Sequence, residues 1–157
     1  AGSNEQPYQS VGRWLLDRGL IKDASWQGIK AWIVSTQQSN PRLVQEMLWS
    51  NPRYVFFREE TRSAADADLG PRGAQGVPLT AGRSIAVDKD SIPYGTPVWL
   101  ASAGPNANLQ RLVFAQDTGS AIVGAVRADY FAGTGAEAGD FAGRMKQGLR
   151  LWVLWPK

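Results

Sequence analysis

The hydrophobic pattern of the chain changes its period part-way along, and this change limits the possible folds more than any other feature. Between residues 8 and 52, large apolar side chains recur every three or four positions, which is the spacing of one helix face. From Leu79 onward they come in short runs rich in β-branched residues, separated by Gly, Pro and Asn, which is typical of strands and turns. The sequence therefore predicts a helical segment followed by a mainly β region.

Three helices are predicted in the first third of the chain, over residues 8–20, 24–37 and 40–52. Each has near its start a side chain that can accept a hydrogen bond from the first free backbone N–H groups: Ser10, Ser25 and Asn40. Pro41 then takes the first helical position, where its missing N–H costs nothing. A short strand is predicted to follow over residues 53–59.

The β region contains five short runs of strand-forming residues, over 78–88, 96–104, 109–117, 124–131 and 148–156. Five or six such strands in about 80 residues favour a small closed barrel, because closure leaves no exposed strand edge. The predicted organisation is a helical segment with a short strand over 1–61, a loop or linker over 62–78 and a barrel domain over 79–157.

Composition excludes several kinds of chemistry. The chain has no cysteine and no histidine, so it has no thiol nucleophile, no imidazole base and no cysteine or histidine ligand for zinc. Its net charge of +3 comes from scattered Lys and Arg, whereas a nucleic-acid-binding protein concentrates them in a stripe. Neither a signal peptide nor an apolar run near 18 residues is visible. Any catalysis is therefore expected to rest on Asp, Glu, Lys, Tyr, Ser or Thr.

Three aspartates end or follow predicted strands of the β region: Asp88, Asp117 and Asp129. A small barrel brings strand ends together, and clustered carboxylates raise one another's pKa, which suits a general acid. An aspartate beside Gly or Lys also closes turns, and spacing alone favours that interpretation for any one of them. The DTGS stretch at 117–120 is also found in pepsin-like aspartic proteases, but those need two copies or a dimer. Glycines near these aspartates lack the Lys and Ser/Thr of a phosphate-binding loop.

The seven tryptophans leave two interpretations open. Trp99, Trp152 and Trp155 could stack on sugar rings, although tryptophans at alternating strand positions more often belong to a core. For the tryptophans of the helical segment, packing in the core or between domains is expected: Trp14, Trp26, Trp32 and Trp49.

Taken together, several segments resemble the C-terminal region of MltA-type membrane-bound lytic transglycosylases, which contains the three-aspartate or 3D domain. They are VPLTAGRSIAVDKDSIPYGTPVWL at 77–100, AQDTGSAIVGAVRADYFAGTGAEAG at 115–139 and LRLWVLWP at 149–156, with YQSVGRWLLDRGLI at 8–21 and NPRYVFF at 51–57 upstream. The resemblance implies a six-stranded double-psi β-barrel in the last half. It also implies cleavage of the β-1,4 bond between N-acetylmuramic acid and N-acetylglucosamine in peptidoglycan, leaving a 1,6-anhydromuramoyl end.

The same resemblance implies a role for each site residue. Asp129 corresponds to the catalytic aspartate, with Asp117 and Asp88 as the other two members of the set. Contacts with the glycan are expected from five further residues: Gly119, Ser120, Ala121, Tyr130 and Arg83. A single carboxyl group suffices because the C6 hydroxyl of the substrate is the nucleophile, whereas an ordinary glycosidase needs two carboxylates. No metal or cofactor is expected.

The resemblance further implies an N-terminal portion of the family, lacking here, that supplies barrel elements and a second domain. We therefore expect the chain to be a C-terminal fragment whose partners are glycan strands and this missing portion. The expected location is the bacterial cell envelope, at the periplasmic face of the outer membrane, with a lipid anchor outside this chain. Two alternatives stay open, a non-catalytic glycan- or cell-wall-binding barrel and an aspartate-dependent hydrolase that uses water.

Overall fold

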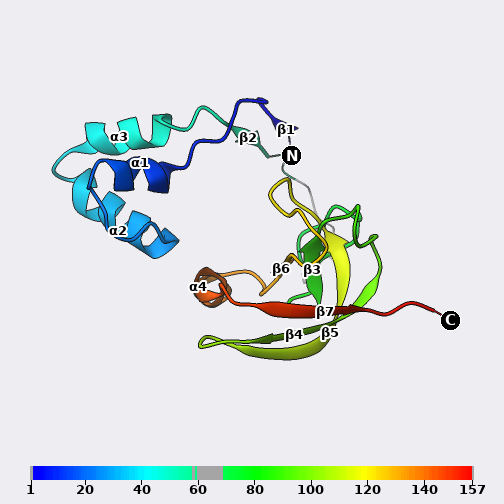
Figure 1. Cartoon of the computed structure of the whole chain (residues 1–157). Helices are drawn as coiled ribbons and strands as arrows, with labels where there is room; N and C mark the ends of the chain where they lie inside the picture. Colours follow the sequence, from blue (N-terminus) through cyan, green and yellow to red (C-terminus); the bar gives the residue numbers. More distant parts are fainter. Residues whose placement is uncertain (1, 58, 60–68, 157) are drawn as a thin grey trace. The chain divides into compact units, whose positions relative to one another are not determined.

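The computed structural model describes residues 2–57, 59 and 69–156, and divides into two compact units. The first unit is Ala1–Thr61 and the second is Arg62–Lys157 (Figure 1). The first seven residues of the linker predicted over 62–78 lie outside the described residues. In the described part of the chain, no helix is long and apolar enough to cross a membrane.

The first unit contains the three predicted helices, α1 (Val11–Asp17), α2 (Trp26–Gln37) and α3 (Pro41–Trp49). All three predicted caps are confirmed. The side chain of Ser10 accepts a hydrogen bond from the N–H of Arg13, Ser25 from Gly28 and Asn40 from Leu43, at 3.1–3.2 Å. Each cap satisfies a backbone donor that the first helical turn leaves free.

A small apolar cluster holds the three helices together, and its buried members are Leu15, Ile29, Val44 and Met47. Trp14 and Trp32 pack against this cluster. Trp26 and Trp49 are exposed, so of the two packing roles expected for them, the one in the core of this unit is wrong. The strand predicted over 53–59 is confirmed only as β2 (Val55–Phe56), which pairs antiparallel with the unpredicted β1 (Gly2–Ser3).

The second unit is built on one mixed five-stranded sheet of β3 (Ser84–Val87), β4 (Pro97–Ala103), β5 (Asn108–Asp117), β6 (Ala128–Tyr130) and β7 (Leu149–Val153). The strand order is β6-β3-β5-β4-β7, in which only β3 and β5 run parallel. Among the described residues, β6 and β7 each pair on one side, so the sheet has two free edges. The structure thus shows a half-barrel of five strands where a closed barrel of six was predicted.

One side of this sheet carries the main core. Its buried side chains alternate along the strands, as the period of two requires: Ile85, Val87, Val98, Leu100, Leu109, Val113 and Ala115, with Ile92 from the loop after β3. We call this the core face of the sheet and the opposite one the outer face.

One further helix, α4 (Ala136–Arg144), lies between β6 and β7 in the chain and was not predicted. Its first turn has no side-chain cap; the N-cap residue is Gly135, with φ at +89°. Because glycine weakens a helix and four glycines occur between 133 and 143, this segment gives little helical signal in the sequence.

Candidate active site

Two of the three aspartates lie in one row across the sheet, on either side of Ala86. In the β3–β5 pair Ala86 is opposite Asp117, and in the β3–β6 pair it is opposite Asp129. Residues directly opposite each other in paired strands project to the same face, which here is the outer face. Two strand spacings of about 4.8 Å each place the two aspartate Cα atoms roughly 10 Å apart, with a methyl group between them.

A bulge in the β3–β5 pair makes this row possible. The register shifts between Ile85 and Ala86, so that both Gln116 and Asp117 are accommodated where a regular ladder has one residue. The hydroxyl of Ser84 donates a hydrogen bond to Oε1 of Gln116. Ser84 and Ala86 are two residues apart on β3, so their side chains project to the same face of the sheet. Gln116 is bonded to Ser84 and Asp117 is opposite Ala86, so both lie on that face.

A cavity of about 240 Å³ opens beside the two carboxyl groups. Its lining includes Asp117, Asp129 and Ala86, with apolar walls from Leu79, Ile122 and Phe131. Leu79 and Ile122 are buried, so one side of the cavity is a fixed apolar surface. The arrangement is a pair of acids beside a small hollow with apolar walls, where a carboxyl group and a substrate could meet.

Asp129 is the least restrained of the three aspartates. Its side chain is 57% exposed, and its Oδ1 lies 3.6 Å from Nε of the equally accessible Arg127. Among the described residues, no backbone N–H group donates to Asp129, in contrast to the other two aspartates. It also borders a second cavity of about 720 Å³ on the side of α4. A carboxyl group in this position can reach a ligand and can exchange a proton.

Asp117 is held in place by the loop that precedes β3. The backbone N–H of Ala74 donates to Asp117 Oδ1 at 2.9 Å, and the N–H of Gln75 donates to the carbonyl of Gln116 at 3.1 Å. This loop carries an isolated bridge between Arg72 and Pro78. Residues 69–78 of the predicted linker are therefore packed against the end of β5 and fix the Asp117 carboxylate.

Asp88 accepts hydrogen bonds that hold in place the loop between Asp117 and Asp129. The N–H of Gly124 donates to its Oδ2 at 2.8 Å and the N–H of Asp90 to its Oδ1 at 3.1 Å. These backbone donors, Gly124 first, hold the pKa of the Asp88 carboxyl below its ordinary value. Asp88 is absent from the lining of the 240 Å³ cavity, so its contact with the site runs through the loop.

A second hydrogen bond secures the same loop, because the hydroxyl of Thr118 donates to the carbonyl of Val87 at 2.7 Å. Two of the predicted glycan-binding residues, Ser120 and Ala121, are exposed in this loop. The carbonyl of Gly119 accepts the N–H of Ile122 at 2.9 Å, and this turn brings the Ile122 side chain into the cavity wall. Sequence reasoning missed Thr118 and Ile122, although both lie within the quoted motif.

The other two predicted glycan-binding residues lie in different surroundings. Tyr130 borders the cavity, and its hydroxyl accepts a hydrogen bond from Nη1 of Arg111 at 2.9 Å. Arg83 lies outside the lining of the cavity, and its Nη1 donates to the carbonyl of Leu112 on β5 at 3.0 Å. The structure therefore groups Tyr130 with the aspartate pair and places Arg83 elsewhere.

In the described part of the chain, no cluster of three or more His, Cys, Asp or Glu side chains could hold a metal ion. The chemistry available at the site is that of carboxyl groups, with hydroxyl and backbone groups around them. Fold and site together define the second unit as a half-barrel domain with two aspartates on neighbouring strands.

Comparison with known proteins gives this arrangement a family. A model described as "3D domain" matches residues 83–155, and one described as "MltA specific insert domain" matches residues 1–58. The membrane-bound lytic murein transglycosylase A of Escherichia coli (strain K12) is 37% identical over 163 residues, covering 98% of this chain and 42% of that protein. The chain belongs to the family of MltA-type lytic transglycosylases, and the resemblance noted in the sequence is confirmed.

Solved structures agree with this assignment. LtgG, a lytic transglycosylase of Burkholderia pseudomallei, is 58% identical, with a TM-score of 0.64 over 97% of this chain and 44% of that chain. E. coli MltA with bound chitohexaose is 32% identical, with a TM-score of 0.80 over 98% of this chain and 45% of that chain. The chain thus spans less than half the length of the relatives it matches.

Proposed function

We propose that this chain is the part of a peptidoglycan lytic transglycosylase that supplies the catalytic acid. The reaction is cleavage of the β-1,4 bond between N-acetylmuramic acid and N-acetylglucosamine, with a 1,6-anhydromuramoyl end as product. The observation that carries the proposal is the row of Asp117, Ala86 and Asp129 over an apolar hollow. A relative crystallised with chitohexaose supports a glycan as the ligand.

Asp129 is proposed to act as general acid and then as general base. Its carboxyl proton passes to the glycosidic oxygen as the bond from C1 to that oxygen breaks, which releases the sugar with a free hydroxyl. The C6 oxygen of the muramoyl residue then bonds to C1 and loses its proton to the Asp129 carboxylate, which restores the acid. Attack within one molecule avoids the entropy cost of capturing water.

The other aspartates are proposed to support this group. Asp117 faces the same cavity, where the backbone N–H of Ala74 holds its carboxyl group in place. Asp88 acts through the loop that it ties to the end of β3. The loop residues Gly119, Ser120 and Ala121 and the ring of Tyr130 are proposed to contact the glycan, while the hydrogen bond of Arg83 to β5 favours a supporting role for that residue.

The remaining predictions about the whole protein are also proposals. Two free sheet edges border the 720 Å³ cavity, whose apolar lining includes Leu100, Leu109, Met145 and Leu149. An unpaired edge beside apolar surface favours the addition of a further strand, so we propose that the portion missing here completes a six-stranded double-psi barrel. We also propose the domain division 1–61, 62–78 and 79–157, and a periplasmic location at the outer membrane, through a lipid anchor outside this chain.

Digestion of purified peptidoglycan tests the function, with products identified by mass spectrometry. The parent and Asp129→Asn are compared, alone and together with the missing portion, and Asp140→Asn on the exposed side of α4 is the matched control. Anhydro ends that disappear only in Asp129→Asn support the proposal. Reducing ends would indicate hydrolysis by water, and binding without products in any of these mixtures would indicate a glycan-binding module.

A further inference from the structure

The outer face of β4 and β7 carries two tryptophans side by side. Trp99 and Trp152 are directly opposite each other in the β4–β7 pair, and Leu112 follows Trp99 in the same row on β5. Trp99 is 41% exposed and Trp152 47% exposed, while Val98 and Leu100, which flank Trp99 in the sequence, are buried on the core face. The expectation that these tryptophans belong to a core is therefore wrong, which leaves the sugar-stacking alternative.

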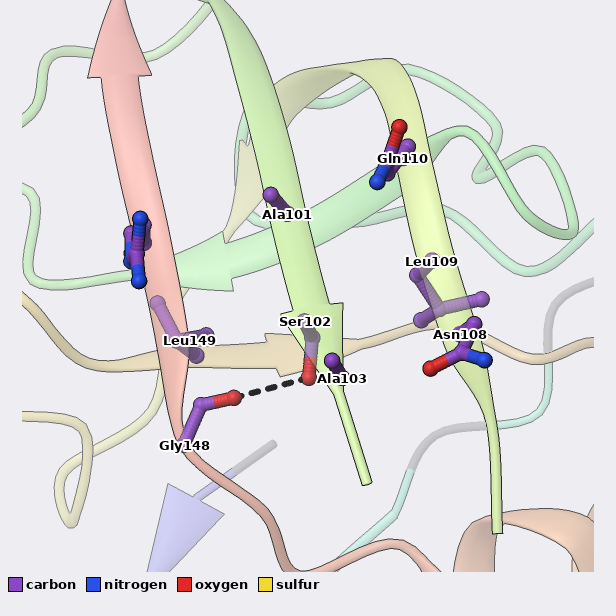
Figure 2. Close-up of a pocket in the computed structure, with 9 residues that line it drawn as sticks. Ala101, Ser102, Ala103, Asn108, Leu109, Gln110, Gly148 and Leu149 are labelled. Atoms are coloured by element: carbon purple, nitrogen blue, oxygen red, sulfur yellow. Dashed lines mark hydrogen bonds between the residues drawn. The ribbon is translucent and has the colours of Figure 1, made fainter. Parts of the chain in front are cut away.

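A trough adjoins this pair of rings. Its floor is Ala101 and Ala103 on the central strand β4, and longer side chains stand beside them, Asn108 and Gln110 on β5 and Arg150 on β7. The hollow measures about 690 Å³, and Figure 2 shows Ala101 and Ala103 between the flanking strands. Ala101 and Arg150 are two residues from Trp99 and Trp152 on their own strands, so the two rings follow next along the same face, just outside the lining of the trough.

Hydrogen bonds on the core face hold the floor of the trough in shape. The hydroxyl of Ser102 donates a hydrogen bond to the carbonyl of Gly148 at 2.9 Å (Figure 2). The same hydroxyl accepts a hydrogen bond from Nε2 of Gln147 at 2.7 Å. The same Nε2 donates to the carbonyl of Ala107 at 2.9 Å. These contacts join β4 to the residues that come just before β5 and β7.

Beside the trough and the rings, the charged side chains of the outer face are all of one sign. Among the outward-facing positions of β4, β5 and β7 that border the trough and the rings, none is acidic, and Arg150 is basic. Planar rings beside amide and guanidinium groups fit a polymer with apolar sugar faces, many hydroxyl groups and carboxylates on its side chains. From Ala103 to Trp99 the strip is about 13 Å long at 3.3 Å per residue, which suits a short stretch of such a polymer.

We propose that Trp99, Trp152 and the trough form a second glycan-binding surface, separate from the aspartate pair. The proposal rests on the proposed function for the chemistry of its ligand. Asn108 and Asp117 are the two ends of β5, about 30 Å apart along the strand. The surface therefore binds a glycan strand at a distance from the scissile bond, and this second contact keeps the protein bound to its polymeric substrate between cleavages.

Two binding measurements on the whole chain test this surface. The first is cosedimentation with purified sacculi of the parent and the Trp99→Ala/Trp152→Ala double variant. Trp26→Ala, at an exposed tryptophan of the first unit, is the control. We expect the double variant to need about tenfold more sacculi for half-maximal sedimentation, the change expected when two aromatic contacts are lost, and the control to match the parent. The second measurement follows the indole N–H signals of Trp99 and Trp152 by NMR during titration with chitohexaose, where both are expected to shift.

Further variants separate the outcomes. Arg150→Glu, a surface change, is expected to weaken sedimentation with peptide-bearing sacculi while chitohexaose still shifts the two indole signals. Unchanged sedimentation of the double variant, or indole signals that chitohexaose does not move, would overturn the proposal. So would a parent dimer that the double variant converts to a monomer, since the face would then join two copies. Binding is read without turnover, whereas the products formed by Asp129→Asn test the catalytic proposal, so failure of one proposal can be told from failure of the other.

Discussion

Replacing Ala86 by leucine is the sharpest test of the aspartate row. The methyl group of Ala86 lies between Asp117 and Asp129, and its neighbourhood opens into the 240 Å³ cavity. Leucine adds three carbons, which would fill the space where a substrate has to approach both carboxyl groups. A displacement of about 1 Å can cost on the order of 100-fold in rate, so we expect turnover to fall by about that factor or more.

Stability is expected to change much less than turnover. Inserting carbons into a filled core costs about 1–3 kcal/mol, but here an existing hollow can receive them, so a cost of about 1 kcal/mol or less is expected. The free energy of unfolding is measured by denaturant titration, turnover by mass spectrometry of anhydro products, and chitohexaose affinity by calorimetry. Ala31→Leu, at an exposed position of α2, is the control. A folded Ala86→Leu variant that binds chitohexaose and turns over like the parent would refute the geometry of the row.

Two further predictions concern stability. Because the pKa of Asp88 is held below its ordinary value of 3.8, its ionised form stabilises the folded chain above that pH, and this contribution is lost as pH falls through the lowered value. Thermal unfolding of the parent and Asp88→Asn from pH 2 to 7 should show a steady difference above about pH 4 that shrinks below it; a difference independent of pH would contradict this. Asn40→Ala removes the cap of α3 and should cost the first unit about 1 kcal/mol in denaturant unfolding, followed by helical circular dichroism. Ser39→Ala, with no capping bond, is its control, and equal stability of the two variants would contradict the role of the cap.

Local signals were enough to predict most of the elements. The three helix caps and the five runs that became strands depend on nearby residues, and they were predicted from spacing and turn residues alone. The helix over Ala136–Arg144 was missed because its glycines hide the helical period, and β1 because two residues carry no pattern. Closure of the barrel could not be predicted from local signals, since it depends on whether the edges β6 and β7 find partners.

The site was predicted through the family resemblance rather than through spacing. From spacing alone, Asp117 and Asp129 are predicted to be turn residues. They lie on either side of Ala86 only because of the register between strands that are far apart in the sequence, and local spacing does not reveal that register. Asp88 holds the loop in place through a hydrogen bond that it accepts from the N–H of Gly124, 36 residues away, and no local pattern predicts such a contact. The core was the wrong prediction for Trp99 and Trp152, which are exposed. Alternation of side chains along a strand shows that the sheet has two different faces, but it does not show which face is covered by the rest of the protein.

The bulge at the end of β5 makes the identity of the cavity-facing residue depend on chain length. In an unbroken ladder Ala86 would be opposite Gln116, and Asp117 would be opposite Val87 and project into the core. Gain of one residue between 115 and 117, with the bulge otherwise kept, would likewise place Asp117 opposite Val87 and bury a carboxylate among apolar side chains, although every aspartate of the motif would still be present. Insertions and deletions in this strand should accordingly be far less tolerated than substitutions, and a relative that keeps all three aspartates but differs in length here need not keep their arrangement.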